Sequence, residues 1–154
     1  SYHQLHMAGH AHSFECWDGA ELVGGLYGVA FDRVFCGESM FSRADNASKV
    51  ALAWLVALMR RSDYRLLDCQ FMTEHLASLG AIEMPQGEYL ELLAAARGAP
   101  ALSLPQAYCA VLSEAEALAV GDGAGAVEAA DGAGLGAALS SPGKLIAQSF
   151  TQTS

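Results

Sequence analysis

Three strand-like segments separated by two short turns constrain this chain more than any other feature of its sequence. Residues 12–17 alternate between polar and apolar side chains, and residues 21–31 and 34–40 are apolar runs. Asp18-Gly19 lies between the first two segments and is a strong two-residue turn signal. Asp32-Arg33 makes the second turn. The sequence therefore predicts an antiparallel meander.

The next segment changes to helical periodicity and has an unusually wide apolar surface over residues 46–61. Asp45 or Asn46 can cap the start of this helix, and Arg60 and Arg61 suit the negative end of its dipole. An apolar surface of this width predicts a helix that is largely buried.

Four shorter segments complete the predicted fold. A strand at residues 64–69 contains an unbroken Leu66-Leu67 pair, which indicates a central position in the sheet. A helix at residues 73–79, a strand at 81–84 and a helix at 88–97 follow. This order predicts an α+β fold, with a mostly antiparallel sheet flanked by helices.

Length and composition divide the chain into three parts. The 154 residues, 53% of them hydrophobic, are enough for one compact domain, which we assign to residues 1–98. Residues 99–120 are expected to form a peripheral extension with a marginal helix at 113–120. Residues 121–154 are rich in Gly and Ala and predict a flexible tail. The most apolar window, residues 50–59, is too short to cross a bilayer, so no membrane partner is expected.

Charge and cysteine content limit the partners and the compartment. The formal net charge is -9 with only eight Lys and Arg, which argues against a chain that binds nucleic-acid phosphates over a broad face. DNA is therefore not expected as a partner. The four cysteines form no C-x-x-C pair, and no secretory signal opens the chain, so a cytoplasmic location is expected.

Three histidines near the start of the chain raise the question of a metal site. His6 and His10 are four residues apart and would share a helix face, and His12 follows closely. No cysteine or carboxylate clusters with them, so ordinary hydrogen-bonded histidines are the better interpretation. We expect no metal.

The second strand-like segment contains three glycines, Gly24, Gly25 and Gly28. Glycine inside a strand marks either a packing bulge or a place where another backbone or a ligand comes close, and the sequence leaves both open. A phosphate loop is excluded because no Lys-Ser/Thr follows the last glycine and a strand continues where a helix would be needed.

Two carboxylates, Glu38 and Asp68, lie at the ends of apolar runs that read as neighbouring buried strands. An ionised group there is costly unless it has a partner. The two acids either hold a cationic ligand or cap and pair with nearby elements, and residue types alone do not decide between these roles.

The strings around these acids resemble a known family. They are Gly37-Glu38-Ser39-Met40-Phe41-Ser42-Arg43, Asn46-Ala47-Ser48-Lys49 and Leu66-Leu67-Asp68-Cys69-Gln70, and their order and spacing closely resemble the bacterial leucyl/phenylalanyl-tRNA-protein transferases. The resemblance covers roughly residues 2–90.

This resemblance implies a fold and an activity. Members of the family transfer Leu, Phe or Met from an aminoacyl-tRNA to the α-amino group of a protein that begins with Arg or Lys, which marks that protein for degradation. Their C-terminal domain looks like the GNAT acyltransferase fold, and no cofactor is implied. Members also carry a small N-terminal domain that serves tRNA, and no stretch of this sequence corresponds to it.

The resemblance also implies roles for particular residues. Asp68 and Gln70 match the positions implicated in peptide-bond formation, and Glu38 would suit the cationic acceptor. The matches for substrate binding are Leu26, Phe35 and Met40, with Ser39 beside them, although plain core is the alternative for the apolar three. Arg43 and Lys49 lie near the predicted site and are weak candidates for contact with tRNA.

Two other functions remain open at this point. The first is a truncated or degenerate domain that binds peptides without catalysis. The second is an acetyl-CoA-dependent acetyltransferase, which fits the sheet, but the chain lacks the glycine-rich pyrophosphate loop that such enzymes place before a helix.

Overall fold

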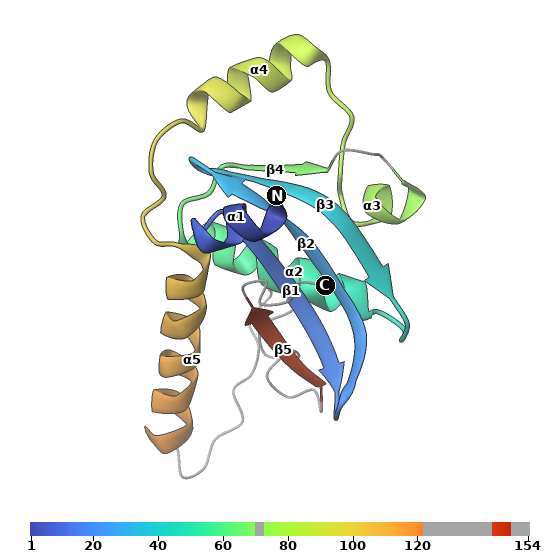
Figure 1. The fold of residues 1–154 in the computed structure, drawn as a ribbon, viewed down its shortest axis with the longest axis vertical. Helices are drawn as coiled ribbons and strands as arrows, with labels where there is room; N and C mark the ends of the chain where they lie inside the picture. The colour runs from blue at the N-terminus through green and yellow to red at the C-terminus, as the bar shows by residue number, and fades with distance from the viewer. Residues whose placement is uncertain (70–72, 122–142, 149–154) are drawn as a thin grey trace.

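A computed structural model describes residues 1–69, 73–121 and 143–148 of the chain (Figure 1). Its elements are α1 (Tyr2–Met7), β1 (Ala11–Asp18), β2 (Glu21–Phe31), β3 (Val34–Ser42), α2 (Ala47–Arg61), β4 (Leu66–Cys69), α3 (Glu74–Ser78), α4 (Gln86–Ala95), α5 (Leu104–Gly121) and β5 (Gly143–Gln148).

One mixed sheet organises the fold, with the strand order β4-β3-β2-β1-β5. The predicted meander is confirmed, because β1 pairs with β2 and β2 pairs with β3, both antiparallel. β5 is antiparallel to β1, and β4 is parallel to β3. The predicted α+β class and the mostly antiparallel sheet are therefore confirmed.

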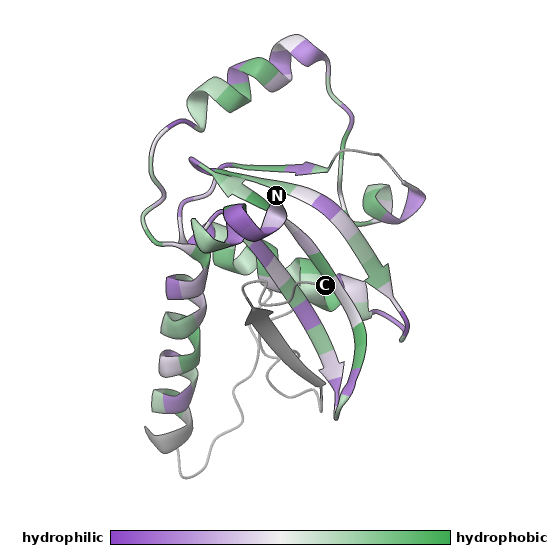
Figure 2. Cartoon of the chain, in the orientation of Figure 1, coloured by the Kyte–Doolittle hydropathy of each residue, from purple (hydrophilic) through white to green (hydrophobic). Residues whose placement is uncertain are grey.

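The core lies between one face of the sheet and the buried helix α2 (Figure 1). Leu55 and Leu58 of α2 are almost fully buried and belong to the same core cluster as Phe14 of β1 and Phe35 of β3. Figure 2 shows apolar and polar residues alternating along the strands, as expected for a sheet with one face against the core. The prediction of a largely buried helix after the meander is confirmed.

The start of α2 is held differently from the prediction. Asn46 occupies the position before the helix with a left-handed backbone at φ 65°, and its side chain makes no capping hydrogen bond. Ser42 serves instead, because its Oγ accepts a hydrogen bond from the backbone N–H of Ser48 at 3.2 Å. The left-handed turn at Asn46 brings the end of β3 back over the start of the helix, so a residue at that strand end reaches the free N–H groups.

The glycines of β2 mark both a bulge and close packing. The pairing of β2 with β3 shifts register between Tyr27 and Gly28, which leaves Glu38 as the extra residue on β3. A Cβ on Gly28 would lie 2.1 Å from the carbonyl oxygen of Cys36, and a Cβ on Gly24 would lie 2.5 Å from the Cβ of Ala47. These two glycines are therefore explained by close approach of the protein's own atoms.

Two predictions about the region after α2 are wrong. β4 is not central. It lies at one end of the strand order, and its Leu66 and Leu67 are therefore only half-buried and line a groove along that edge. The strand predicted at residues 81–84 is absent from this described segment, which runs without regular structure. Ile82 is 74% exposed there, so no packed face favours pairing.

The segment after α4 also differs from expectation. The marginal helix predicted at residues 113–120 is part of the longer α5, and Leu104, Ala107 and Val111 of α5 belong to the core rather than to the periphery. Their spacing places them on one face of a helix, which packs beside α2. The flexible tail predicted for residues 121–154 falls largely on residues 122–142 and 149–154, which lie outside the described part of the chain.

Candidate functional site

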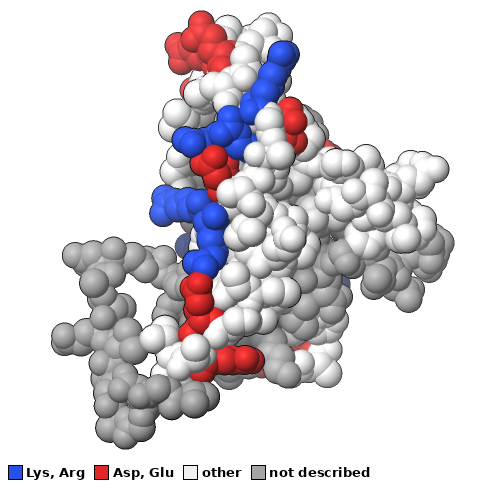
Figure 3. Space-filling model, turned by 90° about the vertical axis from the view of Figure 1, so that its left-hand side faces the viewer, with Lys and Arg blue, Asp and Glu red and all other residues white. Residues whose placement is uncertain are grey.

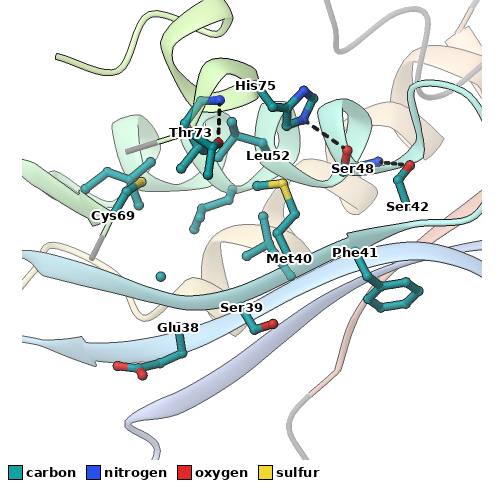
Figure 4. A pocket seen from close by; sticks show the side chains of 15 residues that line it. Glu38, Ser39, Met40, Phe41, Ser42, Ser48, Leu52, Cys69, Thr73 and His75 are labelled. Carbon is teal, nitrogen blue, oxygen red and sulfur yellow. Dashed lines mark hydrogen bonds between the residues drawn. The ribbon is translucent and has the colours of Figure 1, made fainter. Parts of the chain in front are cut away.

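A pocket of about 430 Å³ opens where β3 faces α2 and α3 (Figure 4). Figure 4 shows the Met40 side chain directed from β3 toward Leu52 of α2, with Thr73 and His75 close by. Most of the lining is apolar with a few polar groups, as is common in pockets that bind small molecules. The lining residues are Leu26, Gly37, Glu38, Ser39, Met40, Phe41, Ser42, Ser48, Leu52, Leu55, Leu67, Cys69, Thr73, His75 and Leu76.

One edge of this pocket is polar and joins α2 to α3. Ser48 Oγ and His75 Nε2 lie 3.3 Å apart, and Ser48 is 5% exposed. Thr73 caps α3, as predicted, by accepting a hydrogen bond from the N–H of Leu76 at 3.1 Å. The role of His75 at this edge was not predicted, since nothing in the spacing of Ser48 and His75 indicates that they meet.

One of the two predicted carboxylates, Asp68, contacts the thiol of Cys36, and Glu38 lies two residues further along the same strand. Cys36 is paired with Asp68 across the two parallel strands, and its Sγ lies 3.8 Å from Asp68 Oδ2. Burial raises the pKa of Cys36 to about 11, and the charges of Asp68 and Glu38 contribute to the same shift. The thiol is therefore protonated at neutral pH.

Glu38 is placed by the β-bulge described above. Figure 4 shows its carboxylate on the opposite side of the sheet from the Met40 side chain. The hydroxyl of Tyr2 in α1 donates a hydrogen bond to Glu38 Oε2 at 3.0 Å, and the rings of Tyr2 and Tyr27 pack edge to face. Hydrogen bonding to Glu38 raises the pKa of Tyr2. Glu38 is thus at the pocket rim, with its side chain fixed by α1.

Asp68 has a second donor that residue types alone did not indicate. The hydroxyl of Tyr89 in α4 donates a hydrogen bond to Asp68 Oδ2 at 2.8 Å. This bond is the main reason that the pKa of Tyr89 is raised to about 12, and burial and the charge of Asp68 add to it. Tyr89 lies far along the chain from Asp68, in a helix without a buried face, so periodicity could not reveal it.

A second, larger pocket of about 870 Å³ runs along the outer edge of β4. Asp68 and Tyr89 line it together with the segment that precedes α4. It shares Leu52, Leu67, Cys69 and Leu76 with the first pocket, so the two are neighbours with a common wall. Its lining residues are Leu52, Val56, Leu66, Leu67, Asp68, Cys69, Leu76, Leu79, Gly80, Ala81, Ile82, Glu83, Met84, Gln86 and Tyr89.

The structure brings four of the predicted site residues together at the first pocket. Leu26, Glu38, Ser39 and Met40 line the first pocket. Phe35 does not: it is fully buried and packs edge to face against Phe14, at 6.1 Å between ring centroids. The predicted catalytic residue Gln70 lies outside the described residues.

The two predicted tRNA-contacting cations are exposed and lie beside pocket residues. Arg43 follows Ser42 and is 5.9 Å from the centre of the Phe41 ring, and Lys49 follows Ser48. Elsewhere, Figure 3 shows blue and red side chains interspersed on one side of the molecule. The ion pairs that the structure describes are Arg33–Asp63, Arg65–Asp63 and Arg61–Glu114.

The histidines considered for metal binding have other neighbours. His6 Nδ1 and His10 Nδ1 lie 3.4 and 3.0 Å from the carbonyl oxygens of Ala11 and Ala30. His12 is buried, which lowers its pKa. Within residues 1–69, 73–121 and 143–148, no three His, Cys, Asp or Glu side chains are grouped so as to hold a metal ion.

No helix in the same described residues is long and apolar enough to cross a membrane.

Comparison with known proteins identifies the relatives of this chain. Residues 1–94 match the family described as leucyl/phenylalanyl-tRNA protein transferase. A leucyl/phenylalanyl-tRNA–protein transferase of Novosphingobium aromaticivorans is 54% identical over 166 residues, which covers 100% of this chain and 63% of the relative. The protein of the same name from Rhizorhabdus wittichii is 62% identical over 98 residues, or 64% of this chain and 40% of the relative.

The chain thus spans less than two thirds of each of these relatives. A third protein of the same name, from Zymomonas mobilis, is 60% identical over 96 residues and is matched over 36% of its length. The matched family region contains both carboxylates and all the predicted substrate-binding residues. On this evidence, the chain belongs to the leucyl/phenylalanyl-tRNA–protein transferase family.

Proposed function

We propose that the protein containing this chain moves Leu, Phe or Met from aminoacyl-tRNA to the α-amino group of proteins that begin with Arg or Lys. The observation that supports this most strongly is the apolar pocket that Glu38 helps to line, next to a second pocket lined by Asp68, in a chain of this family. The product would be marked for degradation by its new N-terminal residue. We place the reaction in the cytoplasm, where aminoacyl-tRNA is made, and propose a GNAT-like arrangement for the sheet.

The first pocket would hold the side chain that is transferred. Leu26, Met40 and Leu52 give it apolar walls, and about 430 Å³ is room for a leucyl or phenylalanyl group. Selection in such a pocket depends on shape, and one methylene is worth only about 1–3 kcal/mol. Several related apolar side chains would therefore be accepted.

The acceptor would approach from the side of the carboxylates. Asp68 and Glu38 together suit a cationic amine and the basic side chain next to it. The second pocket, which Asp68 lines, has room for the residues that follow. The common wall of the two pockets would then separate the donor side chain from the acceptor chain.

The chemistry needs no cofactor, because the tRNA ester is already activated. The neutral amine nitrogen attacks the ester carbonyl carbon, the new C–N bond forms, and the C–O bond to the ribose breaks. Asp68 is proposed as the base that accepts one proton from the amine and then gives it to the departing ribose oxygen, which leaves as the tRNA hydroxyl. Gln70 is proposed to donate a hydrogen bond to the developing oxyanion. Orientation of the two substrates would supply much of the acceleration.

Contact with tRNA by this chain would be limited. Arg43 and Lys49 are the cations nearest the first pocket, and each phosphate contact adds about one unit to the slope of affinity against salt. We therefore expect weak binding of aminoacyl-tRNA by residues 1–154 alone. Titrations across a range of salt, with this chain and with the full-length protein, test this, and tight and steeply salt-dependent binding by the chain alone would contradict it.

The catalytic proposal is tested with Asp68→Asn in the full-length protein. Transfer of radiolabelled leucine to a peptide that begins with Arg should fall by about 10² or more, while thermal stability changes little. Asp32→Asn is the matched control, since Asp32 is an exposed turn residue with a left-handed backbone at φ 48° that Asn tolerates. Gln70→Ala is expected to act in the same direction.

The outcomes separate the proposed enzyme from a domain that only binds peptides. Near-normal transfer by Asp68→Asn and by Gln70→Ala would remove both residues from the mechanism. Binding of the Arg-starting peptide by the wild-type protein, without any transfer of leucine, would instead favour the non-catalytic alternative.

A further inference from the structure

We propose that Tyr89 is a positioning residue, which fixes the carboxylate of Asp68 from the helix α4 and keeps one of its oxygens available for the acceptor amine. This inference rests on the proposed role of Asp68 as the base. It adds to that role a residue from a helix that the fold otherwise leaves outside the core.

Both side-chain contacts that the structure describes for Asp68 are on one oxygen. The Tyr89 hydroxyl donates to Oδ2 at 2.8 Å, and the Cys36 thiol lies 3.8 Å from the same Oδ2. No hydrogen-bond donor to Oδ1 is found in the part of the chain that the structure describes. A carboxylate held in this way has one occupied oxygen and one that remains able to accept a proton from the amine.

The need for a positioning group follows from the place of Asp68 in the sheet. β4 lies at the end of the strand order, and Asp68 is only half-buried beside the larger pocket. The last torsion of an aspartate side chain has broad minima, so packing alone does not fix the plane of an edge carboxylate. The neighbouring thiol is a weak donor at a long distance, which leaves the phenol as the stronger restraint.

The Tyr89 hydroxyl is suited to remain the donor throughout the reaction. Its pKa is raised to about 12, so it stays protonated at the pH at which the protein works. A neutral phenol is a much weaker base than a carboxylate, so Tyr89 does not compete with Asp68 for the proton of the amine. Its contribution would therefore be geometric, through the orientation of Asp68.

The arrangement of α4 supports a specific rather than a general structural role for this residue. No residue of α4 is buried, and its neighbours Leu90 and Leu92 are 53% and 45% exposed. Tyr89 also lines the larger pocket with Asp68. Removing the hydroxyl alone, and keeping the ring, would thus disturb the carboxylate without removing apolar contacts from the core.

The test is a double-mutant cycle in the full-length protein, with leucine transfer to an Arg-starting peptide measured under single-turnover conditions. Tyr89→Phe should lower the rate of transfer by about tenfold to a hundredfold, because small displacements of a reacting group cost rates of this size. The affinity for aminoacyl-tRNA should not change. In the Asp68→Asn background, the same substitution should have no further effect on the rate.

Two controls keep the result specific. Tyr64→Phe makes the same chemical change at a tyrosine whose hydroxyl has no hydrogen bond to the residues that the structure describes, and should leave transfer unchanged. Leu90→Ala perturbs α4 next to Tyr89 at an exposed position and should also be silent.

Each outcome decides the inference. A normal rate for Tyr89→Phe beside an impaired Asp68→Asn overturns the role of Tyr89 and leaves the proposed function intact. Equal losses from Tyr89→Phe in both backgrounds would show that it does not act through Asp68. Full activity of Asp68→Asn would overturn the proposed mechanism itself, and this inference with it.

Discussion

The helices α2 and α4 both carry many apolar residues, yet the structure uses them in different ways. Seven residues of α2 are buried, whereas none of the ten residues of α4 is buried. α4 is held by polar contacts near its two ends: Tyr89 binds Asp68, and the Arg33 guanidinium donates to the carbonyl oxygens of Ala95 and Arg97 at 2.9 Å each.

The number of apolar residues in a helix therefore does not determine how much that helix contributes to the stability of the fold. α2 stabilises the protein through area removed from water, which is not directional. α4 is positioned by a few hydrogen bonds, which are directional and act at named atoms. The first helix therefore accounts for stability, and the second is available to orient a group at the site.

The largest expected contrast comes from truncating one leucine in each helix. Leu58→Ala in α2 removes a fully buried side chain and should lower the free energy of unfolding by about 2–5 kcal/mol. Leu90→Ala in α4, where the side chain is 53% exposed, should change it by no more than about 0.5 kcal/mol. Urea unfolding measures both, and similar losses would mean that α4 is packed after all.

The sequence predicted both helices, but it indicated the packing of the first one only, for a physical reason. The wide apolar face of residues 46–61 and the alternation of the meander report burial directly, so α2 and β1 to β3 were placed within a few residues. α4 was also predicted as a helix, at residues 88–97, but its lack of a buried face and its bond to Asp68 depend on where it packs. Contacts between distant segments leave no periodic signal.

The same limit applies to the candidate site. The resemblance named Leu26, Glu38, Ser39 and Met40 as substrate-binding residues. The structure brings these four around one pocket, because they belong to neighbouring positions of paired strands. The resemblance did not show that Asp68 lines a second pocket or that Phe35 is core. The position of β4 was mistaken because two adjacent leucines suggest burial on both faces, and they can instead line a groove at an edge.

Replacing one glycine next to α2 and one glycine in α4 by alanine should change the stability in opposite directions. At Gly24 a Cβ would lie 2.5 Å from the Cβ of Ala47 at the start of α2, so Gly24→Ala should cost about 1–3 kcal/mol. At Gly87 in α4 nothing lies within 4 Å of the new Cβ, and Gly87→Ala should add about 0.5–1 kcal/mol through helix propensity and lower entropy of the unfolded chain. Melting temperatures that move in the same direction would contradict the contrast.

A smaller effect is expected at the start of α2. Ser42→Ala removes the oxygen that accepts the Ser48 N–H and should cost about 1 kcal/mol, as loss of a helix cap does. Asn46→Gly is the matched control, since Asn46 has a left-handed backbone and no capping bond, so this change should be close to neutral. If Asn46→Gly lowers the stability more than Ser42→Ala does, Asn46 is the residue that caps the helix, as the sequence indicated.

The smallest expected effect concerns the polar attachment of α4 and appears as a shift in one titration. The pKa of Tyr89 is about 12, above the value of about 10 for a free tyrosine, first because of its hydrogen bond to Asp68. A folded-state pKa that is raised means that the bond contributes its stability fully below the unfolded pKa and loses it as the pH rises through the folded pKa. The attachment should therefore weaken between about pH 10 and 12, while the apolar contacts of α2 have no such dependence.

The difference in tyrosinate absorbance between the wild-type protein and Tyr89→Phe reports this titration. Asp68→Asn removes the charge that Tyr89 faces, so the midpoint for Tyr89 should move down toward the ordinary value for tyrosine. Glu38→Gln is the control, because Glu38 accepts from Tyr2 and not from Tyr89, and should leave the Tyr89 midpoint in place. If Asp68→Asn leaves the Tyr89 midpoint unchanged, the phenol and the carboxylate do not interact in solution. Of the two polar attachments of α4 described above, only the one at Arg33 would then remain.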